Sequence, residues 1–195
     1  MEDKRIQKTK RKIRETLKAL LDVKPFEEMT VTEICQRSRT SRITFYTYFP
    51  DKYAVVEAMM EDYYKEASKD YHVLLQKNNP ENDGYKGYLN LLECILQMCD
   101  DNFNFFRNVT MEKNPYLNSS FYRFIFNGFD DYIARHSSQV RAIFSSRQTA
   151  AVLCGGLWSV IQENFETGLD DDDVKLRIRK IYSCILDSEL FERVS

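Results

Sequence analysis

The chain has 195 residues, of which 43% are hydrophobic, enough for one good core or for a small head and a larger body. Six glycines and four prolines, with no alternating strand pattern bounded by Asn-Gly or Asp-Gly turns, exclude a strand-rich fold and indicate an all-α one. The net charge of −2 hides 13 Lys and Arg against 9 Asp and Glu in residues 1–60 and 15 against 21 in residues 61–195, the distribution expected if one end faces phosphate.

The first predicted helix covers about residues 4–23 and is amphipathic. Its apolar face consists of Ile6, Ile13, Leu17, Leu20 and Leu21, and its other faces carry Lys4, Lys8, Lys10, Arg11, Lys12 and Arg14. A basic run at a chain end is often only a solvated or frayed segment, and it can also contact nucleic-acid phosphates. The salt dependence of binding discriminates between these alternatives.

A pair of short helices is predicted within residues 30–52, TVTEICQRSRTSRITFYTYFPDK. Thr30 and Glu33 have the spacing of a capping box, so a helix is expected to begin there. A polar run follows as the turn, and Ser41 is a suitable N-cap for a second helix over residues 42–48.

The second helix of the pair has one apolar and one polar side. Phe45 and Phe49 lie four residues apart and can anchor one side in a core. The other side is left to basic, hydroxyl and tyrosine side chains, namely Arg42, Thr44, Thr47 and Tyr48. Pro50 lacks the amide that a continuing helix needs, and Asp51 can cap the next helix, so the unit ends here.

This pattern resembles the helix-turn-helix of the TetR family of bacterial transcriptional regulators. The family signature has threonine, an acid and isoleucine in the first helix, glycine in the turn, then serine, a basic residue, threonine, tyrosine, phenylalanine and a final lysine. The matching positions are Thr30, Val31, Glu33, Ile34, Ser41, Arg42, Thr44, Phe45, Tyr46, Tyr48, Phe49 and Lys52. The resemblance is specific over this segment and fades to a pattern of helices beyond about residue 60.

The resemblance implies a three-helix DNA-binding head over residues 1–52 and a helical body over residues 53–195 that dimerises and binds a ligand. Two positions depart from the family pattern. Arg39 stands where the turn usually has glycine, and positive φ costs other residues about 1 kcal/mol; either the turn differs slightly, or Arg39 accepts this cost and brings a cation near the phosphates. Ile43 stands where many relatives have a small residue, and would offer methyl groups to a thymine.

Further helices are expected along the rest of the chain. A long helix from about residue 51 to residue 76 joins head to body, and the turn-forming sequence NNPENDG at residues 78–84 ends it. The later helices are expected to include residues 88–99, residues 103–109 behind a cap at Asn102, residues 121–132, about 146–167 and about 171–186.

Aromatic side chains crowd the body. In the simpler interpretation they pack its core, and in the alternative some of them line an effector cavity between helices. The candidates for the cavity are Phe103, Phe106, Tyr116, Phe121, Phe124 and Trp158. By resemblance the last two helices form the dimer interface, and the candidates there are Leu157, Ile161, Phe165, Ile178, Ile181 and Ile185.

Other chemistry is not indicated. His72 and His136 fit no ligand or nucleophile spacing, and no phosphate-binding loop or catalytic carboxylate pair stands out, so neither a cofactor nor enzymatic activity is expected. The acidic run 170–173 is interpreted as a helix cap, since it lacks the spacing of a metal site. The five cysteines are expected to be reduced, buried thiols. Without an apolar leader or membrane span, a cytoplasmic protein is expected.

Together these features predict a sequence-specific transcriptional regulator: a homodimer that represses from a double-stranded DNA operator until a small-molecule effector releases it. Arg42 is expected to contact a guanine edge, and Ile43, Thr44 and Thr47 to contact further bases. Phosphate contacts are expected from Thr30, Arg39, Ser41, Tyr46, Tyr48 and Lys52. The alternative function is a DNA-tethered interaction module or co-activator whose body binds a protein partner in place of a small ligand.

Overall fold

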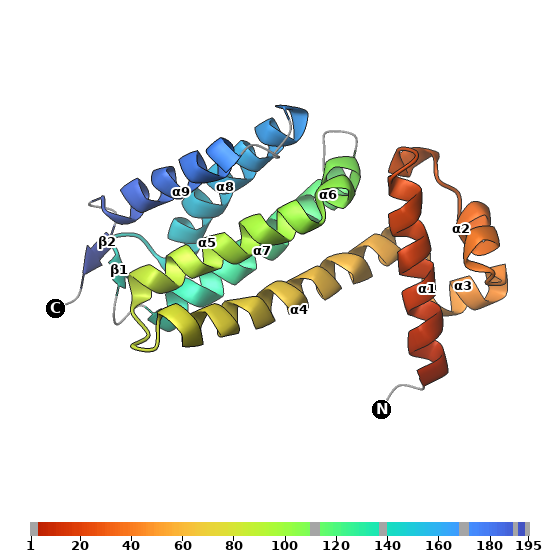
Figure 1. Cartoon of the computed structure of the whole chain (residues 1–195), viewed down its shortest axis with the longest axis horizontal. Coiled ribbons are helices and arrows are strands. Elements are labelled where there is room, and N and C mark those ends of the chain that lie inside the picture. Colours follow the sequence, from red (N-terminus) through yellow and green to blue (C-terminus); the bar gives the residue numbers. More distant parts are fainter. Residues whose placement is uncertain (1–3, 110–113, 137–139, 168–171, 189–190, 194–195) are drawn as a thin grey trace. The chain divides into compact units, whose positions relative to one another are not determined.

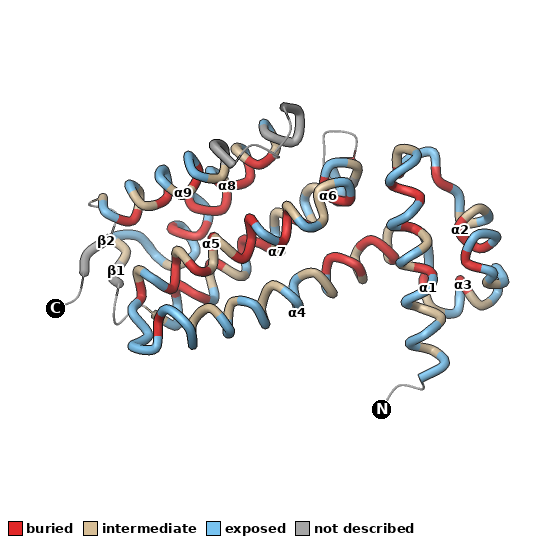
Figure 2. Tube along the Cα trace, viewed as in Figure 1, coloured by how far each residue is buried: buried red, intermediate tan, exposed pale blue. Residues whose placement is uncertain are grey.

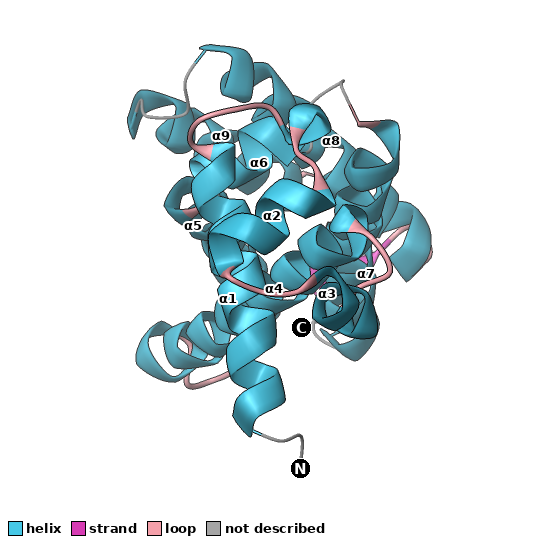
Figure 3. Cartoon of the chain, turned by 90° about the vertical axis from the view of Figure 1, so that its right-hand side faces the viewer, coloured by secondary structure: helices cyan, strands magenta, loops and turns pink. Residues whose placement is uncertain are grey.

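Helices make up nearly all of the secondary structure in the computed structural model, which describes residues 4–109, 114–136, 140–167, 172–188 and 191–193 (Figures 1 and 3). In chain order the elements are α1 (Lys4–Leu21), the 3-10 turn η1 (Phe26–Glu28), α2 (Val31–Ser38), α3 (Arg42–Tyr48), α4 (Lys52–Asn78), α5 (Gly84–Asp101), α6 (Phe103–Val109), α7 (Pro115–His136), β1 (Val140–Ala142), α8 (Ser146–Thr167), α9 (Asp172–Leu186) and β2 (Phe191–Arg193). The predicted all-α class is confirmed. The antiparallel pairing of β1 with β2, three residues each, was not predicted.

The chain forms two compact units. Residues 1–63 and 104–118 form one, here called the head unit, and residues 64–103 and 119–195 form the other, the body unit. Both α4 and α7 therefore have their first residues in the head unit and continue into the body unit. The predicted functional division at residue 52 stays a prediction, because compactness alone does not define what each part binds.

The core of the head unit joins α1, α2 and α3. Apolar side chains from each helix are almost completely buried there (Figure 2). They include Ile13, Leu17, Leu20, Phe26, Ile34, Phe45 and Phe49, none of which is more than 4% exposed. The amphipathic pattern of the first predicted helix is thus explained by this core, although the helix ends at Leu21, earlier than expected.

The start of α2 is capped by Thr30, as its sequence predicted. The Thr30 hydroxyl accepts a hydrogen bond from the Glu33 amide at 3.2 Å. The Glu33 carboxylate, which was expected to complete the capping box, instead pairs with the Lys24 ammonium and lies 3.6 Å from the Arg37 guanidinium. Thr30 therefore caps the start of α2, whereas Glu33 joins the segment before α2 to the helix itself.

In the body unit, α5 packs against α9 and α8 packs against α9. Two ion pairs join α9 to α5: Arg179 donates two hydrogen bonds of 2.7 Å to Glu93, and the Lys175 ammonium lies 2.6 Å from Asp100. The inner positions of α8 and α9 are apolar and buried, and they include Ala150, Leu153, Cys154, Leu157, Trp158, Ile161, Ile178 and Tyr182.

The cysteines form no disulfide in the structure. Burial raises the pKa of the Cys94, Cys99 and Cys154 thiols to about 12, so these three stay protonated and unreactive at neutral pH. Cys184 is exposed, which corrects the prediction that every thiol is buried. The acidic run 170–173 lies outside the residues whose side chains are described.

Close packing between α5 and α7 depends on a glycine. A Cβ atom added to Gly87 would lie 1.7 Å from the Tyr132 hydroxyl oxygen. That hydroxyl donates a hydrogen bond of 3.1 Å to the carbonyl of Gly84, and the Tyr132 ring is edge-on to the Tyr88 ring, with centroids 4.7 Å apart. The absence of a side chain at Gly87 therefore fixes where Tyr132 lies.

Gly87→Ala should destabilise the protein by about 1–3 kcal/mol, because the added methyl group displaces a packed tyrosine. Gly128→Ala is the matched control, since a Cβ there meets nothing within 4 Å and alanine favours a helix. Urea unfolding followed by circular dichroism measures both. Equal unfolding midpoints for the two variants would contradict the packing argument.

Candidate functional site

The second helix of the predicted pair, α3, begins and ends where the sequence indicated. Ser41 is its N-cap, with extended backbone, and the Ser41 hydroxyl accepts a hydrogen bond of 3.0 Å from the Thr44 amide. Phe45 and Phe49 are 0% and 4% exposed and hold one side of α3 in the head core. This anchoring fixes the orientation of the opposite side.

The opposite side of α3 is exposed and chemically mixed. Arg42, Ile43, Tyr46 and Thr47 all lie on it, with Ile43 82% and Tyr46 48% exposed. Burying an isoleucine side chain stabilises a protein by about 1.5–3 kcal/mol, so Ile43 contributes none of this to the isolated head. These neighbouring side chains offer a cation, methyl groups and hydroxyl groups. Groups of these kinds bind to the edges of DNA bases.

The threonine hydroxyls of α3 already have hydrogen-bond partners in the helix or at its cap. Thr47 donates to the carbonyl of Ile43 at 2.8 Å, and the hydroxyls of Ser41 and Thr44 lie 2.8 Å apart. The Thr47 oxygen therefore keeps its lone pairs for an outside donor. It is suited to accept from the amino group of an adenine or a cytosine.

Arg39, in the turn between α2 and α3, adopts the conformation for which glycine is usual. Its φ of 50° and ψ of 43° are left-handed, and its amide donates to the carbonyl of Gln36 at 3.2 Å. Thr40 donates to the carbonyl of Cys35 at 2.9 Å, so the end of α2 is closed by two backbone bonds. Of the two alternatives for this turn, the structure shows the one in which Arg39 accepts the strain and keeps an exposed cation.

The remaining predicted phosphate contacts have different surroundings. The Lys10 ammonium lies 5.8 Å from the centre of the Tyr48 ring, so a cation of α1 accompanies α3. Tyr46 packs edge-on against Phe45, with ring centroids 5.5 Å apart, and keeps about half of its surface exposed. These contacts give both tyrosines a defined position before any partner binds.

Lys52 has partners that the sequence did not indicate. Its ammonium donates to the carbonyls of Phe26, Glu27 and Met29 at 2.8, 3.1 and 3.0 Å, and lies 4.4 Å from the Phe26 ring centre. Partial burial lowers the pKa of Lys52, and the nearby Glu27 carboxylate opposes this shift. An ammonium group has three hydrogens, so all of them are used here. The structure thus gives Lys52 a structural role in place of the expected phosphate contact.

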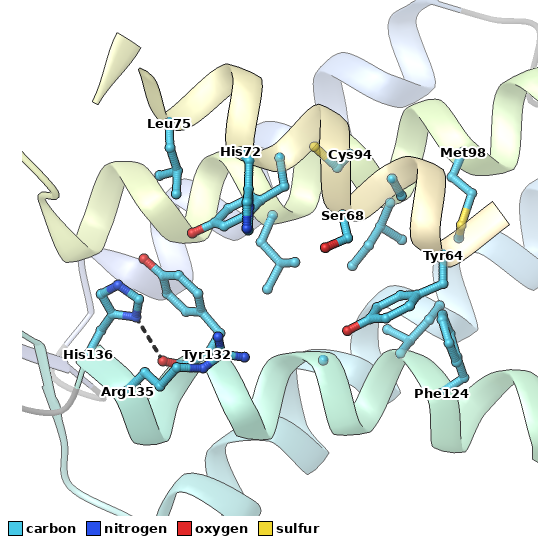
Figure 4. A pocket seen from close by; sticks show the side chains of 16 residues that line it. Tyr64, Ser68, His72, Leu75, Cys94, Met98, Phe124, Tyr132, Arg135 and His136 are labelled. Carbon is cyan, nitrogen blue, oxygen red and sulfur yellow. Dashed lines mark hydrogen bonds between the residues drawn. The ribbon is translucent and has the colours of Figure 1, made fainter. Parts of the chain in front are cut away.

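The body unit contains a cavity of about 200 Å³ with walls from α4, α5 and α7 (Figure 4). Its lining residues are Tyr64, Ala67, Ser68, Tyr71, His72, Leu75, Leu91, Cys94, Ile95, Met98, Phe124, Ile125, Gly128, Tyr132, Arg135 and His136. Phe124 is the one predicted cavity residue among them. The contribution of α4 to these walls was not predicted, because the sequence indicated this helix only as the connection between head and body.

The other predicted cavity residues lie elsewhere, which corrects that prediction. Phe106 packs against Phe105 in the head unit, with ring centroids 5.1 Å apart, and is fully buried. Tyr116 donates a hydrogen bond of 2.6 Å to Glu57, also in the head unit. Phe121 and Trp158 pack with their rings tilted and their centroids 4.7 Å apart in the body core. Phe103 is half-buried and does not line the cavity.

The residues predicted for the dimer interface differ in how far they are buried. Leu157, Ile161 and Ile178 are at most 1% exposed, so they form the core of their own body unit and are not available to a partner, a correction to the prediction. Ile181 is 48% exposed and Ile185 is half-buried. The side chain of Phe165 lies outside the described residues. Helix periodicity alone could not tell which apolar face points inward.

Lys52→Met should destabilise the protein by about 1–3 kcal/mol, because three carbonyl groups lose their donor while the aliphatic chain over Phe26 is kept. The control is Lys69→Met, an exposed lysine on the same helix, which should leave the melting temperature unchanged. Thermal unfolding at matched pH measures both. If the two variants melt alike and Lys52→Met lowers the salt slope of DNA binding by about 1, Lys52 is a phosphate contact after all.

Comparison with known proteins agrees with the geometry of the head. The sequence profile of the bacterial regulatory proteins of the tetR family matches residues 13–59, which include α2, α3 and the turn between them. Comparison with curated protein sequences gives no match. In the described ranges, no helix combines the length and the apolar character that crossing a membrane requires.

Solved structures share the fold at low sequence identity. A putative TetR-family regulator from Syntrophomonas wolfei is 13% identical, with 94% of this chain and 97% of that chain covered and a TM-score of 0.78. A TetR-family regulator from Pectobacterium atrosepticum is 12% identical, with both chains fully covered and a TM-score of 0.68. The fatty acid degradation regulator FadR from Bacillus halodurans is 12% identical, with 90% and 96% covered and a TM-score of 0.67. Residues 13–59 thus carry the signature of the bacterial regulatory proteins of the tetR family, and the chain shares the fold of these solved structures.

Proposed function

We propose that this protein is a homodimeric repressor that binds a twofold-symmetric DNA operator with the α3 helix of each subunit and leaves it when a small molecule occupies the body cavity. The observation that carries this proposal is the exposed face of α3, where Arg42, Ile43 and Thr47 lie together on a helix held from behind by Phe45. A short anchored helix of this kind fits the major groove.

In this proposal different side chains of α3 contact different bases. Arg42 reads a guanine through its O6 and N7 atoms, and Ile43 packs against a thymine methyl group. Thr44 and Thr47 make further base contacts, with Thr47 accepting because its hydrogen is already donated. Phosphate contacts that set the register come from Thr30, Arg39, Ser41, Tyr46 and Tyr48.

The distribution of charge along the chain also supports the binding of DNA by the head. The first 60 residues hold 13 Lys and Arg against 9 Asp and Glu, whereas the remainder is acidic. Lys4, Arg5 and Lys8 are exposed on α1, and Lys10 accompanies Tyr48 of α3. Cations next to a recognition helix increase affinity for any duplex and the rate of association, while the acidic body is repelled.

A homodimer is supported by apolar side chains exposed on α8 and α9. Val152 of α8 is 55% exposed, and Leu176 and Ile181 of α9 are 61% and 48% exposed. A shallow surface depression is lined by Ile181, Cys184 and Ile185 together with Arg177, Lys180 and Ser188. A second copy of the same helices would cover these side chains in a twofold interface, in which each patch meets its own copy.

Release by a ligand is supported by the two helices that the units share. The cavity is lined by residues of α4 and α7, and the first parts of both helices belong to the head unit. A ligand that binds better to one arrangement of α4 and α7 shifts the population of dimers toward that arrangement. DNA is released if the favoured spacing of the two heads does not match the operator half-sites.

Arg42→Ala should weaken binding to the selected operator by about 1–3 kcal/mol and relax base preference at one position of each half-site. The operator is first obtained by selecting bound duplexes from a random pool, and affinities are then measured by fluorescence anisotropy. The control Arg37→Ala removes an exposed cation from α2 and should leave base preference unchanged. Equal losses on operator and random duplex with Arg42→Ala would refute the assignment.

Ile181→Asp should weaken self-association at least about tenfold, or by about 1.4 kcal/mol, because it places a charge on the exposed apolar surface of α9. Val73→Asp is the control, since Val73 is 60% exposed on α4, away from the last two helices. Sedimentation equilibrium measures both variants. A monomeric wild-type protein, or equal association of the two variants, would contradict the proposed interface.

A further inference from the structure

The cavity of the body unit has an apolar part and a polar end. Figure 4 shows Tyr64, Phe124 and Met98 at one end and Tyr132, Arg135 and His136 at the other. Tyr64 and Phe124 pack edge-on, with ring centroids 4.3 Å apart, so two aromatic faces close the apolar end. A ligand with one apolar and one polar end would match both parts.

The charges of the residues that line the cavity indicate which charge the polar end of a ligand should carry. Arg135 is the charged residue among the lining side chains, His72 and His136 are the titratable bases, and the lining includes no Asp or Glu. The Arg135 side chain is 72% exposed; its Nε donates a hydrogen bond of 3.1 Å to the Asp131 carbonyl, and its guanidinium lies 3.9 Å from the exposed Asp131 carboxylate. A ligand cation would meet like charge with no carboxylate in the lining to offset it, whereas a ligand anion would gain a partner.

Hydroxyl groups inside the cavity also favour an acceptor. The Tyr71 hydroxyl is shielded from water and interacts with the hydroxyl of Tyr132, which itself donates to the carbonyl of Gly84. A ligand oxygen that accepts from Tyr71 would form a hydrogen bond in a place that water does not reach. Ser68 offers a second hydroxyl on the same helix, pointing into the cavity in Figure 4. Both groups can donate to a carboxylate.

The size of the cavity limits the ligand. An apolar cavity of about 150 Å³ holds one benzene molecule, and pockets for drug-sized ligands are about 300–1,000 Å³. The volume here, about 200 Å³, leaves room for one ring and a small polar group. Larger ligands would require the walls to move apart.

We propose that the cavity binds a small organic carboxylate whose apolar part is about one ring in size. The ring lies between Phe124, Met98 and Tyr64, and the carboxylate faces Arg135 and His136. This inference rests on the proposed function in one respect, since it takes the bound carboxylate to be the effector. The binding of a carboxylate to the cavity does not itself depend on DNA.

Three size-matched probes test the proposal by isothermal titration calorimetry on the full-length protein: phenylacetate, 2-phenylacetamide and 2-phenylethylamine. Phenylacetate should bind at least about tenfold more tightly than the amide, because only the anion pairs with the guanidinium, and the amine should give no binding heat. Equal affinity for acid and amide, or tighter binding of the amine, would overturn the proposal.

Variants locate the charge that is responsible. Arg135→Gln should lower the affinity for phenylacetate about tenfold and leave that for the amide unchanged. Arg123→Gln is the control, because Arg123 is exposed on the same helix and does not line the cavity. Asp131→Asn removes the competing carboxylate and should tighten phenylacetate binding. An unchanged affinity with Arg135→Gln would refute the role of the guanidinium.

Operator binding, measured separately by anisotropy, distinguishes failure of this inference from failure of the proposed function. If the protein binds its operator but none of the three probes, the carboxylate inference falls and the DNA-binding function stands. If phenylacetate binds with the expected dependence on Arg135 but the operator stays bound, the inference stands and the proposed release by cavity ligands falls.

Discussion

The burial of Phe45 is the constraint on which the candidate DNA-binding surface depends. The helix that carries it, α3, has seven residues, and a helix of this length is not stable by itself in water. Phe45 is 0% exposed in the head core and Ser41 satisfies an amide at the start of the helix, so α3 exists because of these contacts. The exposed positions of Arg42 and Ile43 follow from the same anchoring, since they lie on the opposite side.

Local features of the head could be predicted from the sequence, because each depends on residues within one or two turns. The cap at Thr30 and the bounds of α3 are of this kind, whereas the left-handed conformation of Arg39 was only one of two alternatives. The partners of Lys52 could not be predicted, because they are backbone carbonyls 23 to 26 residues earlier in the chain. A lysine at a family position is therefore compatible with either a phosphate or a structural role, and only the fold distinguishes them.

In the body, the sequence located the helices but not their faces. The helix α8 has apolar residues on more than one side, so Leu157 and Val152 look alike as candidates for an interface, although one is 0% and the other 55% exposed. The aromatic residues raise the same difficulty. Phe121 packs in the core, whereas Phe124, three residues later, lines the cavity. Because a helix turns by about 100° per residue, positions three apart lie on neighbouring but different parts of its surface. Amino-acid composition therefore cannot show which of two such positions faces the core and which faces the cavity.

The polar end of the cavity is held by packing that precedes any ligand. Tyr132 is fixed by the missing side chain of Gly87 and by its hydrogen bond to Gly84, and the His136 ring stacks on Tyr132 with centroids 4.1 Å apart. A site whose side chains are already ordered loses less entropy when a ligand binds. Arg135 lies between these two residues on the same helix, so its exposed side chain is the part of the polar end that a carboxylate would still have to order. The remaining free energy of binding would be available to change the arrangement of α4 and α7.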